Sequence, residues 1–452
     1  SALEKVSNKP AHCVVVNRPE QKATLRAGRD LDWEEVTRSA KPHPCVPVQA
    51  SEPLYILYTS GTTGAPKGVV RDNGGHAVAL KWSMQNIYAM TAGDVFWAAS
   101  DIGWVVGHSY IVYAPLLMGC TTVLYEGKPV GTPDASAFWR VVSEHRVNTL
   151  FTAPTAMRAI KREDPAAELT KKFDLWSLRA LFLAGERADS DTVAWCEQAL
   201  GVPVIDHWWQ SETGWAIAAN CMGLAPLPIK RGSPTKAVPG YDVHVLDDDG
   251  REVGPGETGH IVIKLPLPPG TLPTLWHAEE RDRKSYLTHF PGYYETGDAG
   301  MIDEDGYLYI MARTDDVINV AGHRLSTGEM EEIVADHPAV AECAVIGIND
   351  PLKGQQPIGL VLLKNGVEID DAQIEAELVA MVRKEIGAVA CFRRAIVVQR
   401  LPKTRSGKIL RGTIQKIADN KECKVPATID DPTTLDEIEV ALEGLGLAKA
   451  RT

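Results

Sequence analysis

Between residues 53 and 230, short apolar runs alternate with longer amphipathic segments, and this alternation limits the possible folds more than any other feature. Each apolar run has the length of a strand, while the apolar positions of the longer segments recur with a helical period. Strands that alternate with helices are typical of a parallel α/β sheet. The predicted strands are 54–58, 95–99, 121–125, 149–153, 181–184 and 204–205, and the predicted helices include 77–88, 135–145 and 191–200.

The rest of the chain differs in character. Gly-Pro pairs and the turns DDDG and DEDG mark residues 230–314 as a β-rich subdomain of antiparallel hairpins. We therefore expect a large domain over 1–314 and a small α+β domain over 315–452, which ends in a polar tail. One strand–helix unit, 13–16 with 32–40, precedes the first glycine-rich loop. The expected elements of the small domain are helices 328–337 and 371–386 and strands 341–348, 358–363 and 394–398.

Charge and cysteine usage exclude several classes of protein. The chain has 47 Lys and Arg against 59 Asp and Glu, and its net charge of −12 argues against a nucleic-acid partner. No apolar run reaches the ~18 residues that a membrane span requires. None of the eight cysteines forms a Cys-x-x-Cys pair, so we expect reduced thiols and a cytoplasmic location. The chain starts with Ser rather than Met, so a mitochondrial matrix location after cleavage stays open.

A glycine-rich loop, YTSGTTGAPKG at residues 58–68, directly follows a predicted strand. Backbone N–H groups and hydroxyls in such a loop can surround phosphate oxygens, and a lysine adds positive charge. It is not the P-loop of NTPases, which needs Gly-Lys-Ser/Thr in succession. On spacing alone, a plain surface turn is an equal alternative. The candidate phosphate-binding residues are Thr59, Ser60, Gly61, Thr62, Thr63, Gly64 and Lys67.

From this loop onward, the chain resembles the adenylate-forming superfamily, which contains acyl-CoA synthetases, luciferases and peptide-synthetase adenylation domains. The resemblance covers residues 13–420, and its motifs follow in the family's order. Within the superfamily it looks most like the propionate–CoA ligase branch of the short-chain acyl-CoA synthetases. The matching segments are YTSGTTGAPKG, DIGWVVGHSY (101–110), TAPTAMR (152–158), AGER (184–187), DHWWQSETG (206–214), YYETGD (293–298), RTDDVINVAGHRLSTGE (313–329) and LPKTRSGKILR (401–411).

The resemblance implies a ligase that uses ATP, Mg²⁺ and coenzyme A. A short-chain carboxylate would attack the α-phosphate of ATP to give acyl-AMP and pyrophosphate, and the thiol of coenzyme A would then displace AMP. Lys408 is the implied catalytic residue, because its charge can stabilise the adenylation transition state. The alternative is a solvated lysine in a basic turn. Acylation of Lys408 would remove this charge and is a candidate off-switch.

The resemblance also implies the nucleotide site. Glu212 would hold Mg²⁺, and Gln210 and Ser211 would bind phosphate oxygens, although Ser211 could instead cap a helix. Asp298 would accept both ribose hydroxyls. Arg313 and Arg324 would reach ribose or phosphate, with a surface ion pair as the alternative for each. The residues expected to frame the adenine are Gly185, Glu186, Arg187, Asp206, His207 and Trp208, of which Arg187 stands where many relatives have Pro.

Acyl and coenzyme A contacts follow from the same resemblance. Ala184 is smaller than the Val usual in acetate-using relatives, so it would leave space for one more methyl group and favour propionate; alternatively it is a small core residue. Asp315 would be the hinge about which the small domain rotates. The expected acyl pocket consists of Val105, Val106, Ala184 and Trp209, and the expected coenzyme A contacts are Ala321, Gly322 and Arg383.

Alternatives stay open at this point. The synthetases that the chain resembles carry a further amino-terminal region, so we expect the amino-terminal part of the family fold to be missing. The chain could therefore be a non-catalytic nucleotide-binding fragment, and an acetate–CoA ligase is the nearest enzymatic alternative. A hydrolase is excluded because the segment GHSYI lacks the second Gly of a nucleophile elbow. A metalloenzyme is excluded because there is no His-Glu-x-x-His motif and no paired Cys spacing.

Overall fold

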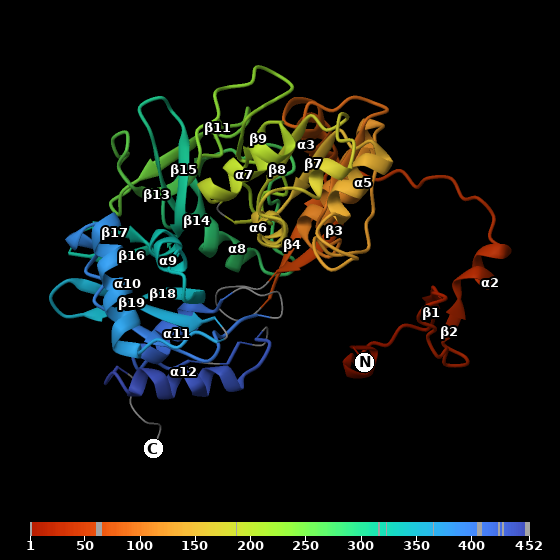
Figure 1. Ribbon diagram of the computed structural model, residues 1–452. Coiled ribbons are helices and arrows are strands. Elements are labelled where there is room, and N and C mark those ends of the chain that lie inside the picture. Colours follow the sequence, from red (N-terminus) through yellow and green to blue (C-terminus); the bar gives the residue numbers. More distant parts are fainter. Residues whose placement is uncertain are drawn as a thin grey trace. The chain divides into compact units, whose positions relative to one another are not determined.

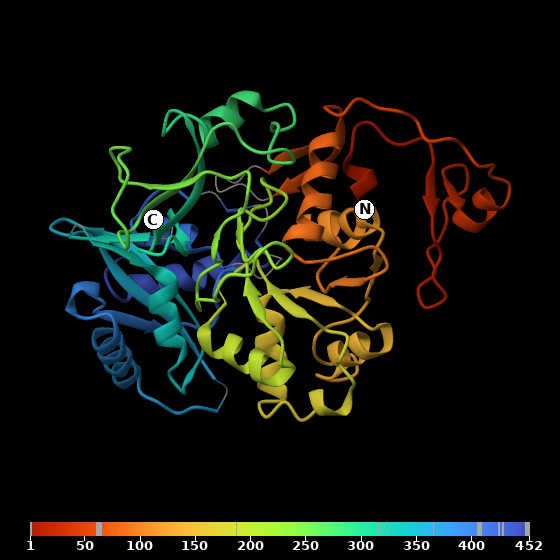
Figure 2. The same cartoon turned by 90° about the horizontal axis from the view of Figure 1, so that it is seen from above.

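The structure is a computed structural model of the chain, shown in Figures 1 and 2. It divides into a unit of residues 1–49 and a unit of residues 50–452. In the part of the chain that is described, no helix is long and apolar enough to cross a membrane. The described residues are 2–59, 66–186, 188–314, 317–321, 323–364, 366–404, 409–423, 425–426 and 429–447.

Residues 1–49 form a small unit with little regular structure. A short helix, α1 (Ala2–Lys5), precedes β1 (Cys13–Val15), which pairs in parallel with β2 (Asp30–Asp32). Asp32 caps the following helix, α2 (Trp33–Arg38), by accepting hydrogen bonds from the N–H groups of Glu34 and Glu35. The predicted strand–helix unit is present, and no side chain among the described residues of this unit is fully buried.

A five-stranded parallel sheet lies at the centre of the larger unit, as the alternating pattern predicted. Its order is β6-β5-β7-β8-β9, and every pair within it is parallel. All residues of β7 and β8 are buried, as expected for central strands covered on both faces. The strands are β5 (Val95–Ala98), β6 (Thr121–Thr122), β7 (Thr149–Thr152), β8 (Ala180–Leu183) and β9 (Val204–Asp206).

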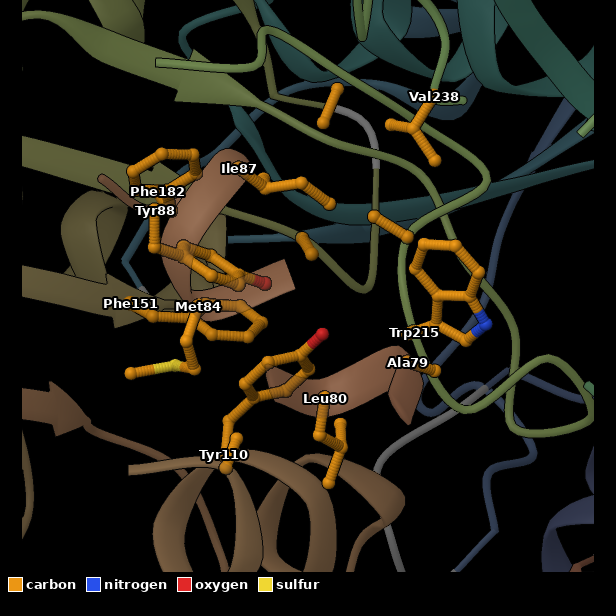
Figure 3. Close-up of a cluster of buried hydrophobic side chains, with 14 of the residues drawn as sticks. Ala79, Leu80, Met84, Ile87, Tyr88, Tyr110, Phe151, Phe182, Trp215 and Val238 are labelled. Atoms are coloured by element: carbon orange, nitrogen blue, oxygen red, sulfur yellow. The ribbon is translucent and has the colours of Figure 1, made fainter. Parts of the chain in front are cut away.

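The two faces of this sheet bury two separate hydrophobic clusters, because successive strand residues point to opposite faces. Phe96, Phe151 and Phe182 lie on the face that packs against α3, while Leu150 and Leu181 lie on the other. Figure 3 shows the first cluster, in which Tyr88 and Tyr110 meet Phe151 and Phe182. The first face is covered by α3 (Asn73–Asn86), η1 (Gly107–Tyr113) and α4 (Ala114–Met118), and the second by α5 (Ala137–His145), α6 (Pro154–Glu163), η2 (Thr170–Lys172) and α7 (Ser190–Leu200).

One predicted member of the parallel sheet lies elsewhere. The strand expected at 54–58 is β3 (Pro53–Thr59), but it pairs antiparallel with β4 (Lys67–Asp72) in a separate two-stranded sheet. A parallel crossover needs a dozen or more residues, and too few separate these two strands. The prediction of a strand was therefore correct and its placement in the parallel sheet was wrong.

The β-rich subdomain is a four-stranded antiparallel sheet in the order β12-β13-β14-β15. This confirms the predicted hairpins. Two short strands, β10 (Ala218–Ala219) and β11 (Lys236–Ala237), form a further antiparallel pair. The strands are β12 (Val243–Leu246), β13 (Gly259–Lys264), β14 (Tyr293–Ile302) and β15 (Leu308–Arg313), and α8 (Glu279–Tyr286) lies between β13 and β14 in the sequence.

The remaining residues form a mixed sheet in which β19 pairs antiparallel with β16 and β18 and parallel with β20. The β17 strand pairs with β16, and α9, α10 and η4 accompany the sheet. The predicted domain boundary at Asp315 falls outside the described residues and stays a prediction. The elements are β16 (Val317–Val320), β17 (His323–Ser326), α9 (Thr327–Ala335), β18 (Val340–Asp350), β19 (Gly354–Leu363), α10 (Asp371–Glu385), η4 (Ala388–Ala390) and β20 (Arg394–Val397).

The expected polar tail instead contains packed helices. After α11 (Arg411–Ala418), the chain forms α12 (Thr433–Glu443), which lies against α11 (Figure 1). Ile438 and Leu442 of α12 are fully buried in a cluster with residues of β18 and β19. The tail is polar in overall composition, yet Leu435, Ile438 and Leu442 recur at helical spacing and form an apolar stripe.

Candidate active site

The predicted motifs converge on one edge of the parallel sheet. The segments DIGWVVGHSY, TAPTAMR, AGER and DHWWQSETG begin at or just beyond the carboxyl ends of β5, β7, β8 and β9. In open α/β sheets, ligands bind at this edge, because the loops there bring together side chains from neighbouring strands. The sheet topology thus assembles the predicted acyl and nucleotide segments side by side.

Three of the four predicted acyl-pocket residues share one hydrophobic cluster. Ala184 is buried there, and Val106 and Trp209 pack against it while partly exposed. The Trp209 ring meets Tyr110 edge to face, with ring centroids 5.5 Å apart. Val105 is also buried but does not belong to this cluster. These three residues thus provide apolar surface of the kind that a short acyl chain would contact.

Glu212 and Lys67 form a direct ion pair. The Lys67 Nζ lies 2.6 Å from the Glu212 Oε1, and both side chains are largely buried. The Tyr286 hydroxyl of α8 donates a hydrogen bond of 3.0 Å to the same oxygen and contacts the Lys67 ammonium. Burial works to raise the pKa of Glu212, but the charge and hydrogen bond of Lys67, helped by Tyr286, lower it below its usual value. Glu212 is therefore an ionised carboxylate, as binding of a hard cation requires.

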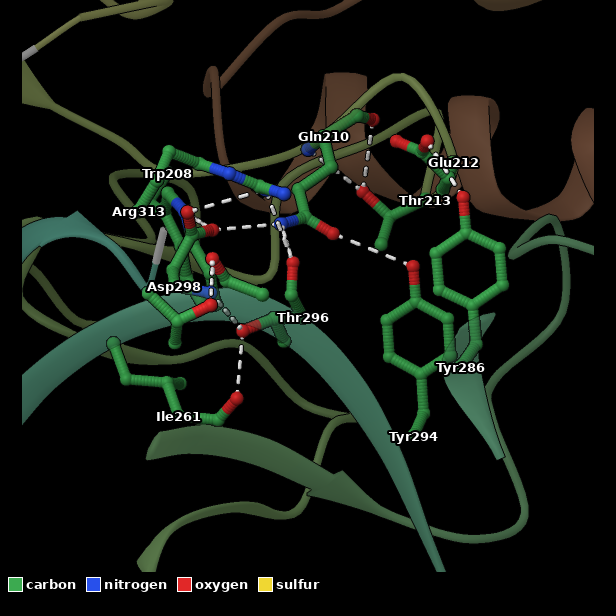
Figure 4. A network of polar contacts seen from close by, with 12 residues as sticks. Trp208, Gln210, Glu212, Thr213, Ile261, Tyr286, Tyr294, Thr296, Asp298 and Arg313 are labelled. Atoms are coloured by element: carbon green, nitrogen blue, oxygen red, sulfur yellow. Dashed lines mark hydrogen bonds and ion pairs between the residues drawn. The ribbon is translucent and has the colours of Figure 1, made fainter. Parts of the chain in front are cut away.

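Asp298 lies in a polar network at the middle of β14 (Figure 4). Its Oδ2 accepts hydrogen bonds from the Gln210 amide at 2.6 Å and the Trp208 indole at 3.2 Å, and its Oδ1 lies 3.4 Å from the Arg313 Nη1. Burial raises the pKa of Asp298 above its usual value, and the Arg313 charge and these hydrogen bonds oppose this shift only in part. Gln210, predicted to bind phosphate, is thus engaged at the predicted ribose carboxylate.

Gly297 makes this arrangement possible. Its φ of +70° lies in the left-handed region, and a side chain there would come within 2.7 Å of the Arg313 guanidinium. The register of β13 against β14 shifts at this position, where Thr296 and Gly297 of β14 have no paired residue on β13. The bulge brings Asp298 toward Trp208 and Gln210.

His207 is a structural residue of the core. Its Nδ1 lies 2.7 Å from the Leu183 carbonyl and its Nε2 lies 3.0 Å from the Tyr88 hydroxyl, so both ring nitrogens have partners. Burial lowers the pKa of His207 to about 4, which keeps the ring neutral. Its backbone can still border a nucleotide, but its side chain is committed to the core. Asp206 ends β9 and is half-buried.

Glu186 closes the amino end of helix α6. The residue before that helix, Ala153, has no capping side chain, and Glu186 accepts a 2.7 Å hydrogen bond from the Thr155 N–H instead. It also pairs with Arg158 of α6 at 2.7 Å. A carboxylate at a helix amino end is favourable, because unpaired N–H groups and the helix dipole meet it there. The preceding Gly185 has a φ of +99°.

Other predicted residues are less informative here. The Thr59 hydroxyl at the end of β3 is buried and lacks a hydrogen-bond partner in the described part of the chain. Ala321 is exposed with a φ of +50°, Arg383 is exposed near the end of α10, and Arg324 belongs to β17. Ser211 is partly buried in the turn that precedes Glu212. The other predicted positions lie outside the described residues, namely Ser60, Gly61, Thr62, Thr63, Gly64, Arg187, Asp315, Gly322 and Lys408.

Sequence reasoning gave no role to several residues of the site. Tyr286 belongs to α8, in a segment without a motif, so no signal pointed to it. Arg71 directly follows two valines of β4, which is a signal, since a charge at a buried strand position needs partners. Tyr294 and Thr296 lie within the quoted YYETGD segment and hold Gln210 and Asp298 through hydrogen bonds.

Comparison with known proteins gives matches over almost the whole chain. The family model described as AMP-binding enzyme matches residues 2–270, and that of the AMP-binding enzyme C-terminal domain matches residues 329–408. The mitochondrial acyl-CoA synthetase short-chain family member 3 of Rattus norvegicus is 54% identical, over 98% of this chain and 65% of its own length. The propionate–CoA ligase of Escherichia coli is 45% identical, over 98% of this chain and 71% of its own length.

Among solved structures, the acetoacetyl-CoA synthetase from Streptomyces lividans superposes with a TM-score of 0.85 at 23% identity, covering 96% of this chain and 66% of that one. The chain thus spans about two thirds of the length of these relatives. AMP-forming CoA ligases use ATP, Mg²⁺ and coenzyme A, the three ligands expected from the sequence. With its large amino-terminal and small carboxyl-terminal domains of the adenylate-forming fold, the chain belongs to the family of AMP-binding enzymes.

Proposed function

We propose that the chain activates a short-chain carboxylate, with propionate preferred, to acyl-AMP and then to acyl-CoA, with release of pyrophosphate and AMP. One observation supports this most directly: apolar residues of one cluster and the ionised Glu212 both follow strands at the carboxyl edge of the parallel sheet, and Lys67 of β4 pairs with Glu212 there. The first suits the acyl chain and the second suits a magnesium–triphosphate group. The activity named for the relatives agrees with this assignment.

In the first half-reaction, a carboxylate oxygen forms a bond to the α-phosphorus of ATP. The bond to the bridging oxygen breaks, and pyrophosphate leaves with its electron pair. Lys67 would meet the phosphates, Asp298 would accept the ribose hydroxyls, and Lys408 would stabilise the charge that develops on the α-phosphate. Glu212 would hold Mg²⁺, which neutralises phosphate charge when it is bound.

In the second half-reaction, the coenzyme A thiol loses its proton and attacks the acyl carbonyl carbon, and AMP leaves. We propose that residues 315–452 move about Asp315 between the two steps and that Ala321, Gly322 and Arg383 contact coenzyme A. Arg313 and Arg324 remain proposed ribose or phosphate contacts. An exposed Arg383 near the end of α10 suits a phosphate of coenzyme A.

Ala184 is proposed to set the length of the acyl chain. Each buried CH₂ contributes about 0.8 kcal/mol, and one methylene typically changes discrimination by about 10–200-fold. Ala184→Val should therefore shift the kcat/KM ratio toward acetate. Ala180→Val is the matched control, because Ala180 belongs to the same cluster but begins β8, whereas Ala184 directly follows the carboxyl end of that strand. An unchanged kcat/KM ratio of propionate to acetate in Ala184→Val would contradict the assignment of Ala184 to the acyl pocket.

The primary experiment is pyrophosphate release by the 452-residue chain with ATP, Mg²⁺ and acetate, propionate or butyrate, with and without coenzyme A. Fastest release with propionate, followed by turnover that depends on coenzyme A, would support the ligase. Fastest release with acetate would favour the acetate–CoA ligase. Binding of ATP without release would favour the non-catalytic nucleotide-binding fragment.

We further propose that acylation of Lys408 switches adenylation off, since a neutral side chain cannot stabilise the transition state. Lys408→Gln should lose adenylation while ATP binding persists, and full adenylation by this variant would refute the switch. A reducing compartment is proposed as the location, either the cytoplasm or the mitochondrial matrix.

A further inference from the structure

Arg71 is the most deeply buried cation beside the candidate active site. It lies on β4 with a relative exposure of 1%, and it follows Val69 and Val70, which are also buried. No motif of the family resemblance includes it. A buried guanidinium is costly unless its N–H groups find acceptors, so the identity of those acceptors is informative.

The acceptors are backbone carbonyls of two distant segments. The Arg71 Nη1 donates to the Glu212 carbonyl at 2.7 Å and to the Gly270 carbonyl at 3.2 Å, and the Nη2 donates to the Ser211 carbonyl. In the described part of the chain, Arg71 forms no ion pair with a carboxylate. Its charge thus serves to hold the turn that carries Ser211 and Glu212.

Gly214 allows the guanidinium to approach this turn. A Cβ at Gly214 would lie 2.6 Å from the Arg71 Cζ, and the φ of Gly214 is +75°. Both the conformation and the missing side chain are therefore needed for contact. The sequence places this glycine two residues after Glu212, the second residue of the turn that Arg71 holds.

Two side chains of the β4 strand contact Glu212 at different atoms. Lys67 and Arg71 are four residues apart on one strand, so their side chains lie on the same face. Lys67 pairs with the Glu212 carboxylate, while Arg71 binds the Glu212 carbonyl. The planar fork of a guanidinium can bridge two adjacent carbonyls, whereas a lysine ammonium cannot reproduce this geometry.

We infer that Arg71 is a positioning residue that fixes the turn of Ser211 and Glu212, so that the Glu212 carboxylate meets Lys67 and the metal-bound triphosphate. The inference rests on the proposed function, because it assumes that the Glu212 carboxylate holds the Mg²⁺ ion of the bound ATP. Residues behind a metal ligand typically alter metal affinity by about 10–100-fold when they are replaced.

The experiment measures the Mg²⁺ concentration for half-maximal pyrophosphate release in wild type, Arg71→Met and Arg71→Lys. We expect an increase of about tenfold in Arg71→Met and little recovery in Arg71→Lys. The control is Arg179→Met, which removes an arginine that is paired with Asp94 just before β8, and it should leave the Mg²⁺ requirement unchanged. In a Glu212→Gln background, Arg71→Met should produce no further increase.

A fall in kcat with an unchanged Mg²⁺ requirement would overturn the inference, since a general loss of folded enzyme has that effect. Circular dichroism and thermal melting establish that the variants fold. If Arg71→Met does not fold, Arg71→Lys carries the same test. Calorimetric measurement of ATP binding at several Mg²⁺ concentrations tests the inference without turnover. If the wild type binds ATP but releases no pyrophosphate, the proposed ligase activity is contradicted. The Mg²⁺ dependence of ATP binding in the Arg71 variants still tests the role of Arg71 in that case.

Discussion

The two buried carboxylates of the candidate active site have pKa values that are shifted in opposite directions. Burial acts to raise the pKa of both groups. At Glu212, Lys67 in direct contact at 2.6 Å reverses this shift, whereas at Asp298 the partly exposed Arg313, 3.4 Å away, does not, and the pKa stays raised. The charge of a close, largely buried lysine outweighs desolvation, and that of a more distant, more hydrated arginine does not. Amide and indole donors complete the shell of Asp298.

This difference suits the groups that each carboxylate is proposed to meet. A magnesium–triphosphate group requires a full negative charge at Glu212, while two ribose hydroxyls require only good acceptors at Asp298. Because the two pKa shifts have opposite signs, the two assignments can be tested separately. The pH dependence of activity and stability distinguishes them, as does the rate of pyrophosphate release.

The largest expected effect is that of Glu212→Gln. Loss of the carboxylate removes the proposed Mg²⁺ contact and leaves Lys67 without its partner, so pyrophosphate release should fall by about 10²–10³-fold. Steady-state kinetics at saturating ATP measure this. Glu304→Gln, in an exposed turn, is the control and should retain the wild-type rate. A Glu212→Gln enzyme with the wild-type Mg²⁺ requirement would contradict the assignment.

Lys67→Met should change the pH profile as well as the rate. Without Lys67, the effect of burial on Glu212 loses its main opposing charge, so its pKa should rise and the acid limb of kcat/KM should move to higher pH. In wild type, the stability contributed by Glu212 is present above the ordinary pKa of glutamate and is lost as the pH falls through its lowered pKa. An acid limb that stays in place would mean that Lys67 does not control Glu212.

Asp298→Asn should weaken ATP binding by about tenfold, because charge-assisted hydrogen bonds to ribose are lost. Its effect on stability should have the opposite pH dependence to that of Glu212. A group with a raised pKa contributes stability below its ordinary pKa and loses it as the pH rises through the folded value. Relative to wild type, the melting temperature of Asp298→Asn should therefore increase from acid to neutral pH, and a constant difference would refute the raised pKa.

Tyr286→Phe should have the smallest effect of the four. It removes one hydrogen bond to Glu212, worth about 1 kcal/mol, and so should slow pyrophosphate release by about fivefold. Tyr125→Phe, on the other face of the parallel sheet, serves as the control. A loss as large as that of Glu212→Gln would mean that Tyr286 contacts the substrate itself.

The fold followed from the sequence wherever periodicity and local spacing determined it. The strands and helices around the parallel sheet were predicted because strands buried on both faces read as apolar runs. The partner of β3 was not predicted, because pairing depends on the short connection to β4 rather than on the composition of the strand. The packing of α12 was missed because an apolar stripe of three residues is weak in a polar segment.

The candidate site was predictable to the extent that its residues lie in motifs. Glu212, Lys67 and Asp298 were named from the sequence, but no pattern showed that Gln210 would bind Asp298 or that Glu186 would cap α6. Such contacts join residues tens of positions apart, and only the folded chain brings them together. Tyr286 is the clearest case, since it reaches Glu212 from a helix without any motif.

The helix α12 has a practical consequence for anyone who divides this protein into parts. The match to the family model of the carboxyl-terminal domain ends at residue 408, whereas buried leucines and isoleucines continue to Leu442. A clone trimmed at residue 408 would lack α11 and α12, which would leave Ile346 of β18 and Leu360 of β19 facing water and would favour aggregation. The folded domain is thus longer than the match to the family model, and gene fragments intended for expression should include α12.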